Sequence, residues 1–551
     1  MYYCYDHNIN WAMITTSTGT MVSLFNLRLN FNNSMQKYIF FTIFILFFIS
    51  VRAMADGMSF RLTTEGAIGN GDFTPYYLTA NRHGILSTDN GTGYVRAAAS
   101  WERSLGAARL QAVADVQLQA DDYSRFYLQQ LAAIASWRYA KVGLGAWEIA
   151  PLLRDASLSS GSTVWSGNAR PIPQVMVSTP GFIDIPGTRQ WLQVYFDIRY
   201  GRYTDDEYLK TRHREHMDYW AERGIDKHEM PNAYVTSGIW HHHKQIHFRT
   251  NPEKTWSGDV GLEHAVQFGG KSVNNANTGY VTTNNSVGLK DFFKVLMPTS
   301  GDGSDNVGDQ NFAYGNHIGN LQATLTYRHE KWHASAYLEN LYEDGSGMAK
   351  RNGWDGLWGV EWHAARPAWV DGVVVEYLQT TEQSGPIHWA PSDFDIAVRQ
   401  QMPDEARGAD DYYNNYYFCG YAHHGQAIGS PMLPSPAYNA DRYLRFANTR
   451  VRAWHIGISG RTATYDVRST MPEDRHVSYR ILLSYRNAYG TPFISSNNVL
   501  HSLNGLAECT YYINSVWSIG ASAAFDHGSL LGNQTAADLR ATYTFKADKG
   551  K

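Results

Sequence analysis

The chain has 551 residues, a formal net charge of −4 and 18% charged residues, against 43% hydrophobic and 14% aromatic residues. Soluble proteins usually carry about 25% charged residues, and a nucleic-acid partner requires a basic run or face. The sequence has no long charge run, so these totals exclude a nucleic-acid partner.

The N-terminal region resembles an export signal. Lys37 precedes an apolar run, Tyr38–Val51, which ends close to a small-x-small cleavage site. The run is shorter than the roughly 20 residues of a membrane helix. We therefore predict a cleaved signal peptide over residues 35–55, an upstream extension over residues 1–34, and a barrel domain over residues 56–551, which could cross a membrane only with strands.

The mature chain alternates apolar and polar residues in many short segments. In the run from Leu110 to Ala120, LQAVADVQLQA, every even-numbered residue is apolar, whereas Asp115 and three glutamines occupy odd-numbered positions. A period of two is typical of a β-strand with one dry face and one wet face. The alternation recurs, and we predict about eighteen strands, near residues 58–67, 93–102, 109–120, 125–137, 142–150, 170–179, 189–200, 234–250, 256–268, 315–328, 332–342, 356–365, 371–381, 442–460, 474–489, 500–512, 516–526 and 535–546.

The connections between these strands fall into two alternating groups. Those of one group are mostly short, such as 138–141 and 251–254, whereas the other group includes the long ones. Outer-membrane barrels have short periplasmic turns and long outer loops, and both termini fall on the short-turn side. The predicted long outer loops are 151–169, 201–233, 269–314 and 382–441.

A closed barrel in a membrane accounts for both patterns. Apolar faces on so many strands must meet a second sheet or lipid, and a closed sheet satisfies every backbone group and leaves no edge. We therefore predict an all-β protein, a transmembrane antiparallel up-and-down β-barrel that is monomeric and lies in the outer membrane of a Gram-negative bacterium. Its partners then include outer-membrane lipid and the barrel-insertion machinery. The even positions of the run 110–120 face lipid, and the odd positions face an interior that contains water.

One predicted strand, 234–250, fits this alternation only in part. Its parity turns His241 and His243 inward, but it also sends His242 and Lys244 towards lipid, where a lysine near the midplane costs roughly 2–4 kcal/mol. Either these two residues lie near the headgroups or a bulge shifts the register. The inward histidines could bind zinc, but no Cys or carboxylate nearby in sequence completes a tetrahedral set, so we favour a hydrogen-bonded lumen lining.

Two outer loops have distinctive compositions. The segment 205–229 is dense in helix formers, so we expect a short helix there. The segment 269–314 is rich in Gly, Asn, Ser and Asp, and we expect it to be mobile.

Two cysteines remain after cleavage, Cys419 and Cys509, so one disulfide is possible.

Several stretches together resemble the capsule assembly Wzi family. They are APLLRDASLSSGSTVWSGNARPIPQV, WHHHKQIHFRTNP, GLEHAVQFGG, LYEDGSGM with DGLWGVEW, YYNNYYFCGYAHHGQAIGSPML and NTRVRAWHIGISG. The resemblance runs from Thr74 to Phe545, and it implies an eighteen-stranded outer-membrane barrel that acts as a lectin for capsular polysaccharide. Enteric members carry a periplasmic helical bundle before the barrel. This chain starts its first strand soon after the cleavage site, so it resembles the shorter form typical of Bacteroidetes.

The stretch VWSGNARPIP carries the first set of candidate sugar contacts. It places Trp165, Asn168 and Arg170 at the edge of a long loop. An aromatic face beside amide and guanidinium groups suits sugar rings and their hydroxyls. The alternative is an interfacial tryptophan of the aromatic girdle followed by a loop entry shaped by proline.

Two further stretches carry candidate contacts. EDGSG places Glu343 and Asp344 in an outward turn, where they could accept hydrogen bonds from sugar hydroxyls, bind Ca²⁺, or simply be solvated. YYNNYYFCGYAHHGQ lies in the longest outer loop and resembles adaptable binding surfaces in composition, although it could instead fold into the barrel as a plug. Its candidate contacts are Asn414, Asn415, Tyr416 and Tyr417.

No catalytic motif is present: the sequence has no G-x-S-x-G elbow, P-loop, HExxH or dinucleotide fingerprint. We therefore expect no enzyme activity, no cofactor and no metal. The predicted function is that of a lectin-like outer-membrane protein that binds capsular or surface polysaccharide and assists its attachment or assembly. The alternative is a porin-like channel for glycans or small solutes, with the polar inward rows as pore lining.

Overall fold

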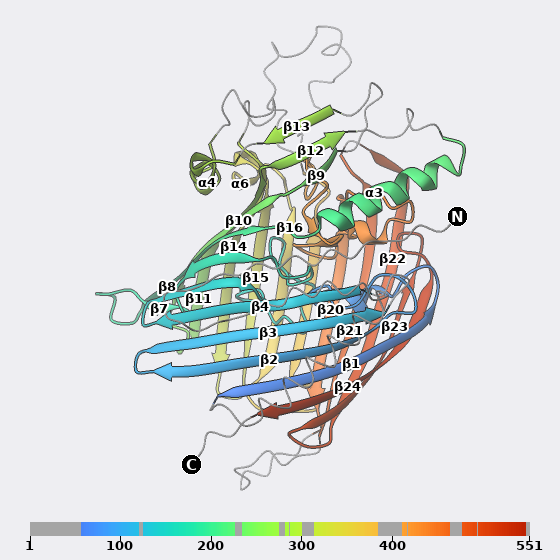
Figure 1. Ribbon diagram of the computed structural model, residues 1–551. Coiled ribbons are helices and arrows are strands. Elements are labelled where there is room, and N and C mark those ends of the chain that lie inside the picture. Colours follow the sequence, from blue (N-terminus) through green and yellow to red (C-terminus); the bar gives the residue numbers. More distant parts are fainter. Residues whose placement is uncertain are drawn as a thin grey trace, which may run out of the picture. The chain divides into compact units, whose positions relative to one another are not determined.

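The protein, seen here in a computed structural model, forms a closed antiparallel β-barrel (Figure 1). All described residues belong to the compact unit Asp56–Lys551. The structure describes residues 57–120, 125–225, 234–274, 281–285, 287–299, 313–383, 410–415, 417–462, 476–492 and 494–546.

The barrel sheet contains nineteen strand segments. β6 and β7 pair with β8 one after the other and count as one interrupted strand, so the barrel has eighteen strands, as the sequence predicts. β1 pairs with β24 from Ser59↔Lys546 to Asn70↔Thr535, which closes the ring. The segments are β1 (Met58–Asn70), β2 (Gly93–Leu105), β3 (Ala108–Ala120), β4 (Arg125–Trp137), β5 (Ala140–Ala146), β6 (Gln174–Ser178), β7 (Ile183–Asp184), β8 (Leu192–Arg202), β10 (Trp240–Thr250), β11 (Trp256–Phe268), β14 (Asn316–His329), β15 (Trp332–Tyr342), β16 (Gly356–Ala364), β17 (Gly372–Gln379), β20 (Val451–Arg461), β21 (His476–Gly490), β22 (Ser495–Tyr512), β23 (Trp517–His527) and β24 (Gln534–Lys546).

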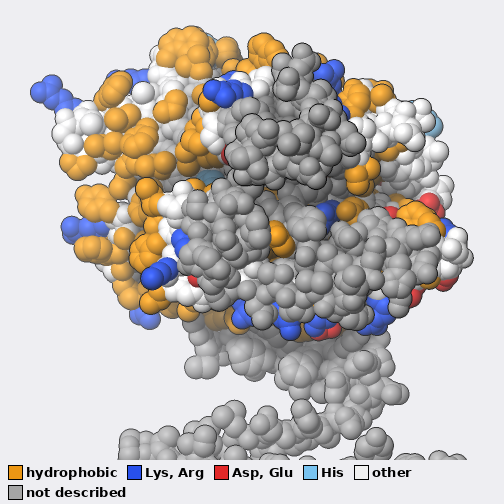
Figure 2. All heavy atoms as spheres, turned by 90° about the horizontal axis from the view of Figure 1, so that it is seen from above, with side chains coloured by type: hydrophobic (Ala, Val, Ile, Leu, Met, Phe, Trp, Pro, Cys, Tyr) orange, Lys and Arg blue, Asp and Glu red, His pale blue; other side chains and the backbone are white. Residues whose placement is uncertain are grey.

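Side chains alternate between the outer wall and the lumen, as the sequence predicts. On β3, Asp115 and Gln117 are fully buried inside the barrel, whereas Val116 and Leu118 lie on the outer wall. Val260 on β11 is 58% exposed on that wall. Figure 2 shows hydrophobic side chains gathered along the wall at the left of the view. An apolar band of this kind is the lipid-facing surface of a transmembrane barrel.

The remaining elements belong to the outer loops. α3 (Asp206–Ala221) confirms the helix predicted within 205–229. The described residues of 269–314 form mainly two strands and a helix. The further elements are α2 (Tyr76–Thr79), β9 (Tyr234–Ser237), β12 (Gly270–Asn274), β13 (Val281–Asn285), α4 (Leu289–Leu296), α6 (Gly345–Met348), β18 (Ala422–His423), β19 (Gln426–Ala427) and the 3-10 helix η3 (Pro436–Tyr438). Across the described ranges, no helix is long and apolar enough to span a membrane.

The single strand predicted over 234–250 is in fact two. β9 ends at Ser237, Gly238 adopts a φ of +70°, and β10 starts at Trp240. β9 leaves the barrel and pairs with β12 in a separate three-stranded sheet. Glycine reaches this left-handed conformation without the steric cost that a Cβ would add, so the chain changes direction there while the apolar pattern continues.

α4 resolves the position of His242 and Lys244. β10 keeps an unbroken register with both β8 and β11, so no bulge turns these residues inward. The Lys244 Nζ donates to the carbonyl oxygens of Val295 and Leu296 at the C-terminal end of α4, and His242 is fully buried beside the ring of Tyr200. The last carbonyls of a helix have no partner within it and accept well from a cation. The lysine is therefore withdrawn from lipid.

The lipid-facing wall generates the first prediction. Replacement of Val260 by arginine places a charge in the middle of β11, and we expect the free energy of unfolding in lipid vesicles to fall by about 2–4 kcal/mol. The control is Glu253→Arg in the exposed turn before β11, with an expected change within about 0.5 kcal/mol. Denaturant titration in vesicles measures both, and equal effects of the two substitutions would contradict a lipid-facing Val260.

Candidate functional site

Three outer loops fold back into the lumen: residues 71–92, 147–173 and 410–450. We call these three loops the plug. Each loop makes hydrogen bonds to inward side chains of the barrel strands. Examples are Tyr76 N to Asp526 Oδ2 (2.9 Å), Ser159 Oγ to Glu376 Oε1 (2.7 Å), and Arg486 Nη1 to the carbonyl oxygen of Met432 (3.4 Å). The polar lumen predicted from the sequence is therefore occupied by protein at this level.

Glu339 on β15 is the main anchor of loop 147–173. Its carboxylate is fully buried and accepts hydrogen bonds from the backbone N–H of Thr163 at 2.8 Å and from the Ser162 hydroxyl at 3.0 Å. It also forms an ion pair with the buried Arg154 at 3.2 Å. A buried carboxylate needs such partners because burial without them costs several kcal/mol. The tip of the loop is thus fixed by charge as well as by packing.

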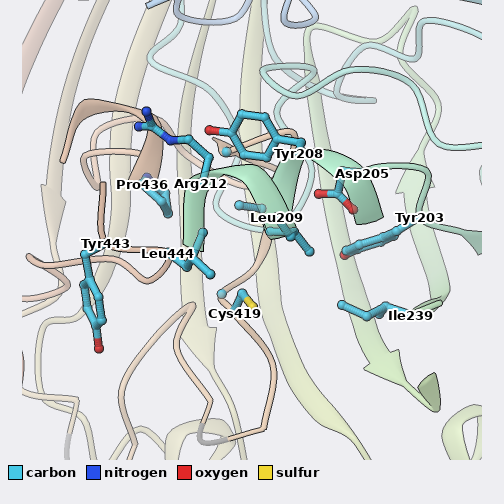
Figure 3. A pocket seen from close by; sticks show the side chains of 13 residues that line it. Tyr203, Asp205, Tyr208, Leu209, Arg212, Ile239, Cys419, Pro436, Tyr443 and Leu444 are labelled. Carbon is cyan, nitrogen blue, oxygen red and sulfur yellow. The ribbon is translucent and has the colours of Figure 1, made fainter. Parts of the chain in front are cut away.

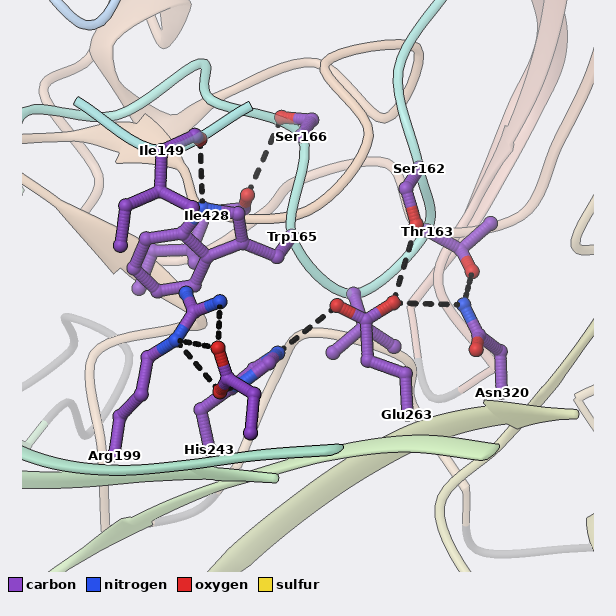
Figure 4. A network of polar contacts seen from close by, with 12 residues as sticks. Ile149, Ser162, Thr163, Trp165, Ser166, Arg199, His243, Glu263, Asn320 and Ile428 are labelled. Carbon is purple, nitrogen blue, oxygen red and sulfur yellow. Dashed lines mark hydrogen bonds and ion pairs between the residues drawn. The ribbon is translucent and has the colours of Figure 1, made fainter. Parts of the chain in front are cut away.

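His243 of β10 belongs to the same polar layer (Figure 4). His243 lies 2.9 Å from Glu263 Oε1, and the other oxygen of Glu263 accepts from Ser162 at 3.4 Å and from Asn320 at 3.5 Å. Such contacts agree with a hydrogen-bonded lumen lining. No group of three or more His, Cys, Asp or Glu residues placed to hold a metal ion occurs among the residues that the structure describes.

Trp165 and Asn168 lie inside the plug. The Trp165 Nε1 donates to the carbonyl of Ile149 at 3.1 Å, and its ring packs against His241 and His243. Asn168 is fully buried. It accepts from the backbone N–H of Asn81 at 2.9 Å and donates to the carbonyl of Ala427 at 2.9 Å, so one side chain joins all three loops of the plug.

Arg170 lies where the plug meets the outer ends of β3 and β4. Its guanidinium donates to Gln119 and Gln129 at 2.8 Å each and stacks on the ring of Tyr127, with its central carbon 3.5 Å from the ring centroid. Gln119, Tyr127 and Arg170 also line a small pocket that is open to solvent. The pocket opens at the end of the barrel that carries the long loops, which is the predicted outer face.

Positive charge dominates this pocket, which we call the arginine pocket. Its charged lining consists of Arg125, Arg170, Arg212 and Arg442 against Asp89 and Glu215, and its aromatic lining is Tyr127 and Tyr208. Within this lining, Arg212 forms an ion pair with Glu215 at 3.3 Å. Burial, and then the charges of its histidine and arginine neighbours, hold the pKa of His424 well below its usual value. That histidine is therefore neutral at neutral pH and adds no charge.

α3 forms one wall of the arginine pocket and also covers a smaller neighbouring pocket (Figure 3). Tyr208 and Arg212 of α3 line both, while Leu209 packs beneath the helix beside Cys419. Cys419 is buried there and Cys509 is exposed on β22, so the possible disulfide is not formed. α3 is thus a structural part of the outer face and not a loose loop.

Glu343, Asp410 and Asp411 meet at a second place on the outer face. The Glu343 carboxylate accepts from the backbone N–H of Asp411 at 3.3 Å. Burial and the neighbouring carboxylates raise the pKa of Glu343 well above its usual value, and burial and Asp344 raise the pKa of Asp410 to about 7. Asn414 is buried and bonds to Asp411 and to the backbone of Phe446, so it holds this loop together.

The other candidate contacts of this loop are placed as follows. The Asn415 Oδ1 accepts from the backbone N–H of Tyr417, which makes a local turn, and both side chains are partly buried. Tyr416 lies outside the described residues. Of the eight candidate residues that the structure describes, Arg170 alone lines the arginine pocket, while Glu343, Asp344 and Asn414 gather with Asp410 and Asp411.

Sequence reasoning missed most of the arginine pocket. Arg125, Tyr127 and Gln129 share the inward face of β4 and alternate with the exposed Phe126 and Leu128. This alternation at the outer end of a strand is the sequence signal that could have identified Arg125 and Tyr127 as pocket residues. Arg212 and Arg442 gave no comparable signal, because they come from a helix and a loop that the fold alone brings together.

Comparisons with known proteins agree with this architecture. The family model described as capsule assembly protein Wzi matches residues 78–434. The chain is similar to the solved structure of Wzi from Escherichia coli, described as an outer membrane protein involved in group 1 capsule assembly and as a carbohydrate-binding β-barrel. The TM-score is 0.53 at 11% identity over 94% of this chain and 90% of that chain.

Similarity to other barrels is weaker. OccK5 (OpdH) from Pseudomonas aeruginosa gives a TM-score of 0.42 at 9% identity, covering 89% of this chain and 98% of that one. OccAB4 from Acinetobacter baumannii gives 0.40 at 10% identity, covering 90% and 99%. No curated protein sequence matches this chain.

The buried carboxylates generate a pH prediction. A carboxyl group whose pKa is raised in the folded state stabilises that state at low pH, fully below about pH 4, and the stabilisation is lost as the pH rises through the folded pKa. Since the pKa of Asp410 is about 7, we expect the amides of residues 410–415 to lose protection between about pH 5 and pH 8. Hydrogen exchange, corrected for its intrinsic pH dependence, measures this loss.

Asp410→Asn is expected to flatten that profile. Asp72→Asn, which changes an exposed carboxylate in loop 71–92, is the matched control and is expected to leave it unchanged. Protection of residues 410–415 that stays constant with pH in the natural chain would contradict the buried acid cluster.

Proposed function

This chain belongs to the capsule assembly protein Wzi family, and from that premise we propose that it is a non-enzymatic outer-membrane protein that binds surface polysaccharide and assists its attachment or assembly at the cell surface. It is an outer-membrane β-barrel of a Gram-negative bacterium. The observation that carries the proposal is the arginine pocket, an open, positively charged and partly aromatic pocket on the face with the long loops.

The chemistry of the arginine pocket fits an acidic polysaccharide. Guanidinium groups form strong, geometrically specific hydrogen bonds with carboxylates, and the four arginines exceed the two acids of the lining. Tyr127 and Tyr208 offer rings for sugar stacking, and Asp89 and Glu215 can accept hydroxyl hydrogens. Arg170 is held by two glutamines and a tyrosine before any ligand arrives, which lowers the ordering cost of binding.

The remaining candidate residues take two roles in this proposal. Trp165, Asn168 and Asn414 position the plug and so shape the binding face from within. Glu343, Asp344, Asn415 and Tyr417 form a further contact region on the outer face for a polymer longer than one pocket. Tyr416 lies outside the described residues and stays a predicted contact. A polysaccharide is long enough to touch both regions, so the proposal includes both as contact sites.

Binding is favoured over the alternative function, conduction through a channel. The plug fills the lumen with buried side chains held by ion pairs and hydrogen bonds, which supports a closed barrel. We further propose that the protein acts as a monomer, since one chain closes the ring, and that its other partners are outer-membrane lipid and the barrel-insertion machinery.

The plug yields a conductance prediction. We expect the purified protein to carry no steady current across a planar lipid bilayer, and we expect Glu339→Ala to open a current. That substitution leaves the buried Arg154 without its carboxylate, a loss of about 3–5 kcal/mol for a buried pair. Glu330→Ala in an exposed turn is the control and should stay silent. A steady current through the natural protein would favour the channel instead.

The arginine pocket yields a binding prediction. The double variant Arg125→Gln with Arg442→Gln removes two partly exposed charges, each contributing about 1 kcal/mol, so we expect roughly 30-fold weaker binding. Calorimetry on the detergent-solubilised protein, with surface polysaccharide from the source bacterium, measures Kd.

Two controls sharpen this experiment. Arg351→Gln, an exposed arginine in the loop between β15 and β16, should bind as the natural protein does. The same polysaccharide after chemical reduction of its carboxyl groups should bind weakly to every variant. Equal binding by the natural protein and the double variant would exclude the arginine pocket as the site.

A further inference from the structure

α4 lies against the outer wall of the barrel, at the outer ends of β8, β10 and β11 (Figure 1). The ring of Phe292 packs edge-on against three wall residues, with centroid distances of 5.2 Å to Tyr200, 5.4 Å to Trp240 and 5.6 Å to Phe268. Val295 is fully buried in the same cluster. These contacts are on the lipid side of the wall, so α4 is neither part of the plug nor near the arginine pocket.

Polar bonds fix α4 in this position. The Tyr200 hydroxyl donates to the carbonyl of Phe292 at 2.8 Å, and Lys244 donates to the last carbonyls of the helix. At the other end, the N–H of Gly288 donates to Asp291 at 2.7 Å. The helix therefore presents a defined second face away from the wall.

That second face is strongly apolar and exposed. Leu289, Phe293 and Met297 are 83%, 69% and 71% exposed. Leu289 and Phe293 are four residues apart and lie in one row along the helix, and Met297 follows directly after the last helical residue. Three large exposed apolar side chains on one short segment are unusual on a surface that meets water. Neither the plug nor the arginine pocket accounts for them.

The row continues the lipid-facing band of the barrel. Directly below α4 on β10, Ile246 and Phe248 are exposed on the outer wall, at positions next along the strand from Lys244. Lys290 of α4 is exposed beside the row and can reach the phosphate headgroups at the membrane surface, as lysines at interfaces do. A helix with one apolar and one polar face, lying against the membrane-spanning wall, matches an interfacial helix.

We propose that α4 is an interfacial membrane anchor, with Leu289, Phe293 and Met297 inserted among the acyl chains of the outer leaflet. The occupant of this face is lipid because the row is continuous with a surface that already contacts lipid. The anchor ties the long loop between β11 and β14 to the membrane surface. It does not depend on polysaccharide binding.

Collision measurements on a nitroxide label test the anchor. Phe293→Cys is introduced into a chain whose natural cysteines are replaced by serine, labelled, and inserted in vesicles of phosphatidylcholine with phosphatidylglycerol. We expect frequent collisions with oxygen, which dissolves in lipid, and few with a water-soluble nickel chelate. A label at Lys210, exposed on α3, is the control and should show the opposite ratio, with at least a tenfold difference between the two sites.

Two results would overturn the proposal. Frequent nickel collisions at position 293, as at position 210, would place the face in water. Few collisions with both reagents would mean that protein covers the face, either a second copy or another partner. Labels at Leu289 and Met297 must agree with position 293, and because all three residues are exposed, the substitutions leave the packed core intact.

Discussion

The closure of one continuous backbone ladder between β1 and β24 is the constraint on which the rest of the structure depends. In hydrocarbon every unpaired N–H or C=O group costs several kcal/mol, so the sheet must join its own first and last strands. A closed sheet with a two-residue period then sends alternate side chains of every strand into the lumen. The polar groups of the lumen, such as Asp115 and Gln117, follow from this geometry.

A polar lumen must in turn be satisfied, and the plug does so. Glu339 takes its partners from loop 147–173, and Arg486 takes carbonyls from loop 410–450. The loops supply hydrogen-bond partners for the inward side chains of the strands, and the same bonds hold the loops in place. The outer surface can therefore present its side chains in fixed positions. Arg170, clamped by Gln119 and Gln129, shows the result, which is a charged group oriented by the fold.

The period of two and the alternation of loop lengths predicted the barrel, its strand number and its orientation, because both depend on local side-chain order. Two predicted strands have other bounds in the structure: the strand 234–250 is divided at Gly238, and the strand 442–460 begins only at Val451, as β20. The sequence could not show this, because an alternating pattern does not reveal a left-handed glycine or a loop that remains partly apolar. The sequence showed that Lys244 does not fit the apolar face of its strand. It could not show that the lysine is bonded by α4, a helix some fifty residues further along the chain.

The candidate site was predicted less well than the fold. Composition pointed to loops that the fold brings to the outer face, and of the predicted residues Arg170 lines the arginine pocket. Trp165 and Asn168 have the residue types that bind sugars, yet such groups also hold buried loops together, and only tertiary contacts distinguish the two uses. The pocket collects side chains from β3, β4, α3 and three loops, and only the closed barrel brings these elements together.

The bond from Tyr76 N–H to Asp526 joins the first outer loop to the last hairpin, across 450 positions of the chain, and Gln534 accepts from the N–H of Phe73 beside it. Half of this lock is therefore made by residues that leave the ribosome last. These two anchors of loop 71–92 can therefore form only after the last hairpin is in place. A truncated chain that lacked the final hairpin would lose these anchors of loop 71–92 together with two strands of the wall.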